Sequence, residues 1–406
     1  MIKVDKKTTI KFSMLFLAIF IGFLSVEAFT RVMVNYKNKK AILGFYQSDQ
    51  YIAQSLKPNA QGVLQSRTKD EFSVSIKTTD QGFRDIRSYE IPKPNNTMRI
   101  LMLGDSFTLG HGVEVEETFA KVLERELNNN FPNTHFEVIN AAYASGFTWD
   151  EAYLFTKVKG LSFEPNLVIE NIWVGNDLKE LGEHEYPKLD GDNLPEKIIS
   201  NRTFVTEDGY LMPLNISKKR RITGPAAVAN EIICDHSQFC SVILRPFIDR
   251  TIKNLKNNAV EEKPASLYVD FLLKDLNPEN QKNWEIGKKM LLGMKKILKD
   301  NQKDFLIVNI PPKEQIYDPY GILKDTSIDD KRLENFVGSN NISYCDVLSK
   351  LQQKPDEVYF PTDSHLNTLG HKLTAEAIQN CIISFGFLSL ESQSMVPSSR
   401  VRTSKY

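Results

Sequence analysis

The chain has 406 residues, of which 41% are hydrophobic and 25% are charged. This is the composition of an ordinary globular protein with enough apolar side chains for a sizeable core, and the length allows one large domain or two. The 51 basic residues balance the 51 acidic residues, so the net charge is zero. No global field draws such a protein to nucleic acid, and no basic motif replaces one. We therefore expect no nucleic-acid partner.

The first pattern along the chain is an apolar run near the N-terminus. Residues 12–26 are almost continuously apolar, and four lysines precede them. A helix over residues 12–30 would span about the 30 Å hydrocarbon core of a bilayer. The preceding lysines favour a signal anchor whose N-terminus stays in the cytoplasm. We predict a single-pass transmembrane helix within residues 1–35 and an extracytoplasmic remainder, periplasmic or at the cell surface.

A cleaved signal peptide is the alternative for this run. Its cleavage site would be Val26-Glu27-Ala28. Glu27 and the bulky Phe29 make that site a poor one, so the uncleaved anchor is favoured.

The next segment, residues 36–95, is largely polar and contains three prolines. We expect it to connect the membrane helix to the first strong strand. Within it, residues 78–85 (Thr-Thr-Asp-Gln-Gly-Phe-Arg-Asp) have by themselves the composition of a turn.

From residue 96 to residue 385, short apolar runs alternate with segments of helical periodicity. Strands are predicted at residues 99–103, 135–143, 166–174, 304–310 and 342–347. Helices are predicted at residues 118–130, 149–159, 285–299, 330–337 and 366–382. This alternation predicts a parallel sheet covered on both faces, that is, a three-layer α/β/α sandwich. In such folds ligands bind beyond the carboxyl ends of the strands.

Residues 179–284 form an insert that interrupts the alternation. Residues 207–209 (Glu-Asp-Gly) predict a hairpin turn. The basic run 218–221 is either a solvated face or a contact for an anionic glycan or lipid headgroup. We expect the insert to act as a lid or substrate platform, and the Ser-rich tail over residues 386–406 to be disordered.

The four cysteines fall into two pairs. Cys345 and Cys381 lie in apolar, patterned segments and are predicted to be plain core residues. Cys234 and Cys240 flank five residues of the insert, where an extracytoplasmic location favours a disulfide slightly over free thiols. Together with His236 these two thiols fit no zinc pattern, and we predict no metal.

A serine follows the predicted strand 99–103 in the sequence Gly104-Asp105-Ser106. In a tight strand-to-helix turn a serine hydroxyl can point out of the fold, with the helix start facing a developing oxyanion. The competing interpretation is a plain helix N-cap. Thr108 stands where the motif Gly-x-Ser-x-Gly requires glycine, which disfavours the α/β-hydrolase elbow.

Near the C-terminal end, Asp363 precedes His365 by two residues in a predicted turn before a helix. At this spacing the carboxylate can bind one ring nitrogen and leave the other to take a proton from a serine. The alternative is an Asp N-cap with an incidental histidine.

Two further residues are candidate oxyanion donors. Asn176 follows Gly175 after the strand 166–174 and offers an amide donor. Gly146 can bring a backbone N–H close to the same point because it has no Cβ. Taken alone, each glycine would more often be a turn residue.

The remaining histidines lack this pattern. His111 and His371 have no carboxylate at the spacing of the Asp363–His365 pair, so we predict structural or peripheral roles for them. His135, His184 and His236 stand apart in the sequence and suggest no metal site.

Taken in order, these blocks resemble the SGNH (GDSL) hydrolase family over about residues 75–385. Residues 78–85 resemble a segment that precedes the catalytic strand in many membrane-anchored members. The resemblance implies a serine esterase without a cofactor, in which the Ser106 N–H, Gly146 and Asn176 hold the oxyanion. It also implies O-acetyl esters of extracytoplasmic polysaccharide as substrates. An O-acyltransferase with the same site and a non-catalytic glycan-binding or assembly protein are the alternatives.

Overall fold

The computed structural model describes residues 6–38, 44–66, 71–143, 147–201, 203–206, 209, 211–213, 274–317, 331–388 and 404–405. The chain divides into two units by its contacts. One comprises Met1–Ala41 and Ile216–Ser266, and the other comprises Ile42–Asn215 and Leu267–Tyr406.

The described part of the first unit is the helix α1 (Lys6–Asn38). Its stretch Ser13–Met33 is long and apolar enough to cross a membrane, a test that a signal sequence also passes. The one acidic residue of this stretch, Glu27, is paired with Arg31 one turn later at 2.8 Å. The Thr30 hydroxyl donates to the Val26 carbonyl. These side chains find their partners within the helix, as polar groups in a membrane-spanning segment must.

The second unit is built on a parallel six-stranded sheet with the order β14-β13-β12-β7-β5-β6. The strands are β5 (Thr97–Gly104), β6 (His135–Asn140), β7 (Leu167–Trp173), β12 (Asp304–Ile310), β13 (Ser343–Asp346) and β14 (Ser404–Lys405). Numbered along the chain from β5, the first five have the order 2-1-3-4-5, that of flavodoxin-like folds. The topological switch point lies between β5 and β7, where such folds bind ligands.

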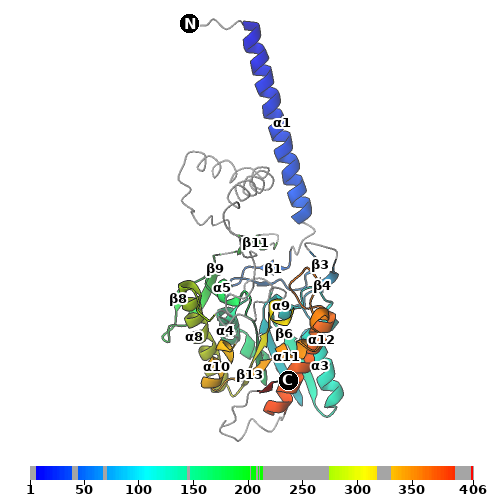
Figure 1. Ribbon diagram of the computed structural model, residues 1–406, viewed down its shortest axis with the longest axis vertical. Helices are drawn as coiled ribbons and strands as arrows, with labels where there is room; N and C mark the ends of the chain where they lie inside the picture. Colours follow the sequence, from blue (N-terminus) through cyan, green and yellow to red (C-terminus); the bar gives the residue numbers. More distant parts are fainter. Residues whose placement is uncertain are drawn as a thin grey trace. The chain divides into compact units, whose positions relative to one another are not determined.

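Different helices cover the two faces of the sheet, so the predicted three-layer α/β/α fold class is confirmed. Along β5, Ile100 and Met102 pack into one core cluster while Leu101 and Leu103 pack into the other, because successive side chains of a strand point to opposite faces. The covering helices are α3 (Phe119–Asn130) and α12 (Thr368–Phe385) on the first face, and α4 (Trp149–Val158), α8 (Pro278–Asp300) and α10 (Arg332–Ser339) on the second (Figure 1).

Short helices connect these elements at the edges of the sheet. They are α2 (Ser106–Leu109), α5 (Asp177–Leu181), α9 (Lys313–Tyr317) and α11 (Leu348–Leu351), with 3₁₀ turns η1 (Val115–Glu117), η2 (Gly160–Phe163) and η6 (Pro355–Glu357).

The segment before β5 is more than a polar connector. It contains two antiparallel pairs, β1 (Tyr46–Gln47) with β2 (Ser55–Leu56) and β3 (Gln61–Gln65) with β4 (Ser73–Lys77). In β4 the side chains alternate, and Val74 and Ile76 are buried in the core cluster that also contains residues of α4 and α8. Phe45 and Phe83 join the same cluster. These apolar side chains, spaced among polar ones, make the segment part of the domain core.

Two hairpins of the insert are described, β8 (His184–Leu189) with β9 (Pro195–Ser200) and β10 (Thr203–Val205) with β11 (Leu211–Pro213). Gly209 in the second loop has φ +85°, so the predicted hairpin is confirmed. The run 218–221 and most of the insert lie outside the described residues.

Helix α8 begins seven residues earlier than the pattern predicted. The Asn277 side chain accepts a hydrogen bond from the Asn280 N–H, and Pro278 takes the first helical position. Both are start signals of a helix. Trp284, which the pattern had left in the insert, is therefore a helical residue, and its ring packs edge-on against Trp149.

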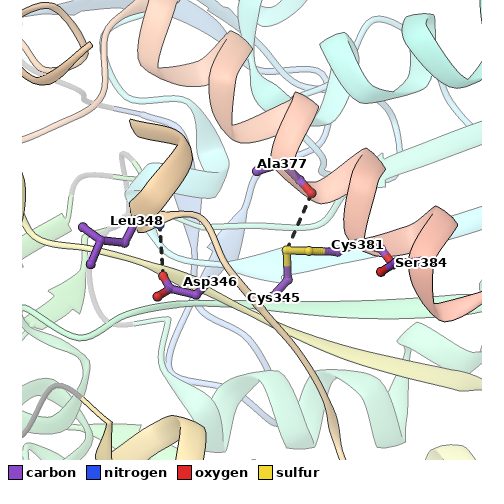
Figure 2. The surroundings of a disulfide bond; sticks show 6 residues. All are labelled: Cys345, Asp346, Leu348, Ala377, Cys381 and Ser384. Atoms are coloured by element: carbon purple, nitrogen blue, oxygen red, sulfur yellow. Dashed lines mark hydrogen bonds between the residues drawn. A yellow bond between two sulfur atoms is a disulfide. The ribbon is translucent and has the colours of Figure 1, made fainter. Parts of the chain in front are cut away.

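Cys345 of β13 and Cys381 of α12 form a disulfide (Figure 2). The prediction that both are plain core residues is wrong in this respect. Cys381 lies on the inward face of α12 as expected, and that face packs over β13. The Cα atoms of Cys345 and Cys381 are 5.9 Å apart. The pair Cys234 and Cys240 lies outside the described residues.

Part of the C-terminal tail is also described. Ser404–Lys405 pairs in parallel with residues 345–346 of β13. The predicted disorder of the tail does not hold at these two residues or at residues 386–388, where Gly386 caps α12, and most of the tail lies outside the described residues.

Candidate active site

Ser106 stands at a sharp turn between β5 and α2. Gly104 has φ +144°, and a Cβ at this position would lie 2.3 Å from Thr108 Oγ1 and 2.9 Å from the Asn171 carbonyl oxygen. The Asp105 side chain caps α2 by accepting from the Phe107 N–H at 2.9 Å. Only glycine fits at position 104, because Thr108 and Asn171 approach its backbone so closely. The turn leaves Ser106 partly exposed at the carboxyl end of β5.

The imidazole of His365 bridges Ser106 and Asp363. Its Nε2 lies 2.7 Å from Ser106 Oγ, and its Nδ1 lies 2.5 Å from Asp363 Oδ1. Asp363 Oδ1 also accepts from the His365 backbone N–H at 3.0 Å. An ionised carboxylate only accepts, so it assigns the ring proton to Nδ1. Nε2 is then the acceptor that faces the serine hydroxyl.

The Asp363 carboxyl stays ionised at neutral pH. Burial raises its pKa, but the hydrogen bond and charge of His365 outweigh burial and lower the pKa to about 2. The carboxylate therefore orients the imidazole and can stabilise an imidazolium.

Carboxyl groups buried around the serine turn behave in the opposite way. Burial raises the pKa of Asp105 to about 7, although the Phe107 N–H counteracts it. Burial likewise raises the pKa values of Glu170 and Asp177, and Asp105 adds to both shifts. A raised pKa reduces the negative charge that these carboxyl groups place beside the serine turn.

Asn176 stands at the end of the neighbouring strand. It occupies the cap position before α5, just after β7, and Gly104 of β5 is in register with Asn171 of β7. The Oδ1 atom of Asn176 is buried and accepts no hydrogen bond from the described residues. Asn140, at the end of β6, donates to the Thr108 carbonyl at 2.8 Å and ties that strand end to the serine turn. Gly146 lies outside the described residues.

His111 lies against His365, so of the two roles expected for it, structural or peripheral, its contacts favour the structural one. Its ring stacks on the His365 ring with centroids 4.2 Å apart and planes at 26°. The loop that carries it is held by Arg84, whose buried guanidinium donates to the carbonyls of Leu109, Gly110 and Val113. The only sequence signal for Arg84 is its place in the turn segment 78–85.

Two other histidines, His371 and His184, link elements of the fold. His371 is buried on α12, where its Nδ1 accepts from the Phe119 N–H at 3.2 Å and burial lowers its pKa to about 3. Nδ1 of His184 lies 2.8 Å from Asp150 Oδ2, in a buried pair that joins β8 to α4.

His111, Asp363 and His365 have ligand atoms within 4.8 Å of one another, as a metal site would require. The ring orientations argue against this use. A ring nitrogen binds a metal in the plane of its ring, and two stacked rings do not aim their nitrogens at one point. Both nitrogens of His365 are also engaged by Ser106 and Asp363.

Three of the solved structures to which this chain is similar share 11–13% of its sequence. It is similar to a lipolytic protein of the G-D-S-L family from Desulfitobacterium hafniense DCB-2, at 13% identity and a TM-score of 0.35, covering 70% of this chain and 99% of the other. It is similar to a catalytic mutant of an acetylxylan esterase from Geobacillus stearothermophilus, at 11% identity and a TM-score of 0.35, covering 70% and 94%. It is also similar to a two-domain esterase active on acetylated mannans, at 12% identity and a TM-score of 0.35, covering 76% and 54%.

No family model and no curated protein matches the chain. The first of the three similar structures belongs to the family that the sequence blocks resemble. At these identities the functional conclusion depends on the geometry of the site itself.

Proposed function

We propose that this protein is a serine-dependent ester hydrolase of the SGNH type. The observation that carries the proposal is the continuous chain of contacts from Ser106 Oγ through the His365 ring to Asp363, at 2.7 and 2.5 Å. Nucleophile, base and orienting carboxylate in this arrangement define serine acyl transfer.

The proposed reaction starts with proton transfer from Ser106 Oγ to His365 Nε2 while Oγ attacks the ester carbonyl carbon. The carbonyl oxygen becomes an oxyanion, held by the Ser106 N–H, the Gly146 N–H and the Asn176 amide. His365 then returns the proton to the leaving alcohol as the tetrahedral intermediate collapses to an acyl-enzyme. Water, deprotonated by the same histidine, attacks the acyl-enzyme; as the second tetrahedral intermediate collapses, His365 returns this proton to Ser106 Oγ and the acid is released. Asp363 stabilises the imidazolium in both halves.

We propose an extracytoplasmic location for the catalytic domain, with α1 as its membrane anchor. The Cys345–Cys381 disulfide supports this location, because disulfides persist in oxidising compartments and are rare in the cytosol. The apolar stretch Ser13–Met33 supports the anchor. For the substrate we propose acyl esters of polysaccharide, O-acetyl groups above all, following the family resemblance of the sequence blocks.

The test is turnover of p-nitrophenyl acetate by the full-length chain purified in detergent, with and without oligosaccharide acceptors. Hydrolysis that acceptors do not change supports the esterase. Turnover that acceptors stimulate, with acyl product on the sugar, would replace it with the acyltransferase. Ser106→Ala should lose both turnover and labelling by a fluorophosphonate while keeping the wild-type circular dichroism. An inactive, unlabelled wild type would leave the non-catalytic glycan-binding role.

A further inference from the structure

The loop that carries the proposed base has little regular structure of its own. Residues 360–365 lie between Tyr359 and Leu366, which form an isolated antiparallel bridge, and the Phe360 N–H donates to the His365 carbonyl. Pro361 and Thr362 are exposed, and Asp363 and His365 are only partly buried. A loop with so few internal bonds needs outside contacts to hold two side chains in a productive geometry.

One such contact is Glu71, 292 positions away from Asp363 in the sequence. Its Oε1 accepts from the Thr362 N–H at 2.7 Å, and its Oε2 accepts from the Asp363 N–H at 2.9 Å. Both carboxylate oxygens are thus used on successive backbone donors of the loop. Hydrogen bonds to a charged acceptor are the stronger kind.

The second contact comes from helix α9. Lys313, at the start of α9 after β12, donates from Nζ to the Phe360 carbonyl at 2.7 Å and to the Pro361 carbonyl at 2.8 Å. A negative side chain therefore holds the N–H groups of residues 362–363, and a positive one holds the carbonyls of residues 360–361.

Phe72, the neighbour of Glu71, adds aromatic contacts with the loop and with His111. Its ring lies 5.0 Å from the Phe360 ring and 5.4 Å edge-on from the His111 ring, by centroids. The Phe72 carbonyl accepts from the Ser66 N–H, and this bond extends the pairing of β3 with β4. Glu71 and Phe72 directly precede β4 in this hairpin.

We propose that Glu71 is a positioning residue for the catalytic triad: with Lys313 as its counterpart, it fixes the loop that presents Asp363 and His365. This inference rests on the proposed function, since it assigns a role in the same reaction. It makes the β3–β4 hairpin, in the segment between α1 and the sheet, a part of the catalytic apparatus.

The test uses Glu71→Gln, in which one carboxylate oxygen becomes an NH₂ group that cannot accept from the second loop N–H. We expect kcat on p-nitrophenyl acetate to fall by about 10- to 100-fold, the range that a small misplacement of a catalytic group costs, with KM unchanged. Lys313→Met should act in the same direction. The double variant should lose less than the product of the two effects, because both changes loosen one loop.

Matched controls are available at the opposite edge of the sheet. Glu164 accepts from the Lys93 N–H, and Lys295 donates to the Asn340 carbonyl. Glu164→Gln neutralises a carboxylate that accepts from a backbone N–H, Lys295→Met removes an ammonium group that donates to a backbone carbonyl, and both variants should leave kcat unchanged.

A second readout does not need turnover. The Nδ1 proton that His365 shares with Asp363 should give a downfield proton NMR resonance, assigned by its absence in His365→Ala. Glu71→Gln should broaden or shift this resonance, and Glu164→Gln should not. An unchanged resonance in Glu71→Gln would overturn the proposal, whether or not kcat falls, and so would a changed resonance with wild-type kcat. If the wild type turned over no ester, the proposed esterase function would fall, and the resonance alone would decide whether Glu71 positions the pair.

Discussion

The imidazole of His111 stacks on that of His365, with ring centroids 4.2 Å apart. Phe107 contacts the His365 ring as well, at 4.8 Å between centroids. The proposed base therefore contacts two aromatic side chains in addition to its bonds to Ser106 and Asp363. Such contacts restrict the orientation of the ring without occupying its nitrogens, which face Ser106 and Asp363.

This stack predicts different outcomes for two substitutions of His111. His111→Phe keeps an aromatic face against His365, and kcat should stay close to that of the wild type. His111→Ala removes a ring contact worth about 0.5–1.5 kcal/mol, and kcat should fall by up to about tenfold. The measurement is kcat on p-nitrophenyl acetate for both variants. Equal activity of the two variants would show that the stack has no part in catalysis.

The oxyanion donor and the triad should differ in their response to substitution. Asn176→Ala keeps nucleophile and base, so fluorophosphonate labelling should persist at a lower rate. Turnover should drop by about 10²–10³-fold, or roughly 3–4 kcal/mol, the usual cost of one oxyanion donor. His365→Ala should be more damaging because the serine then lacks a base.

The kcat of Asp363→Asn should be close to that of His365→Ala, because the amide favours the wrong imidazole tautomer. All three variants can be compared by kcat and by the rate of labelling. An unchanged kcat in Asn176→Ala, together with an inactive Asp363→Asn, would remove Asn176 from the oxyanion site and leave the triad.

The disulfide between Cys345 and Cys381 should be present in the mature protein and should stabilise it. Its loop, with a sequence separation of 36, corresponds to about 2–4 kcal/mol of free energy of unfolding. Iodoacetamide applied to denatured, unreduced protein should leave both cysteines unlabelled, as peptide mapping would show. Labelling of either residue under these conditions would contradict the bond. The double variant Cys345→Ala/Cys381→Ala should unfold at a lower urea concentration.

The buried pair of His184 and Asp150 predicts a pH-dependent stability. Burial lowers the pKa of His184, but the charge and hydrogen bond of Asp150, with Glu151 and Glu180 nearby, outweigh burial and raise it to about 9. A histidine with a raised pKa contributes stability that is fully present below pH 6.5 and is lost as the pH rises through 9. The hairpin β8–β9 should therefore loosen from α4 in this range.

The measurement is urea unfolding of the wild type and of His184→Gln across the pH scale. The difference in unfolding free energy between them should be constant below about pH 6.5 and should shrink toward pH 9. A difference that stayed constant through pH 9 would mean that His184 is neutral in the folded protein.

The N-terminal segment should remain on the mature protein if α1 is an anchor. Residues 12–26 are apolar, and the site after Ala28 is a poor one for cleavage. N-terminal sequencing of protein extracted from membranes should therefore find residues 1–30. A mature chain that began at Phe29 would instead identify a signal peptide.

The sheet and its order of elements could be read from the sequence because strand and helix periods are local properties. The apolar run over residues 99–103 and the helical period over residues 118–130 lie within a residue or two of β5 and α3. The blocks around Ser106 and around Asp363–His365 could be found for a similar reason: each places its chemistry in a short turn whose residue types are distinctive.

Tertiary packing decided which distant residues meet at these turns. Glu71 reaches the Asp363 loop across 292 positions, His111 reaches His365 across the sheet edge, and Cys345 meets Cys381 across 36 positions. No periodicity encodes such contacts, because they depend on how helices and hairpins pack once the sheet has formed. A glutamate in a polar segment and a cysteine on an apolar face are ordinary residues in the sequence, and their roles arise only from the side chains that the fold brings beside them.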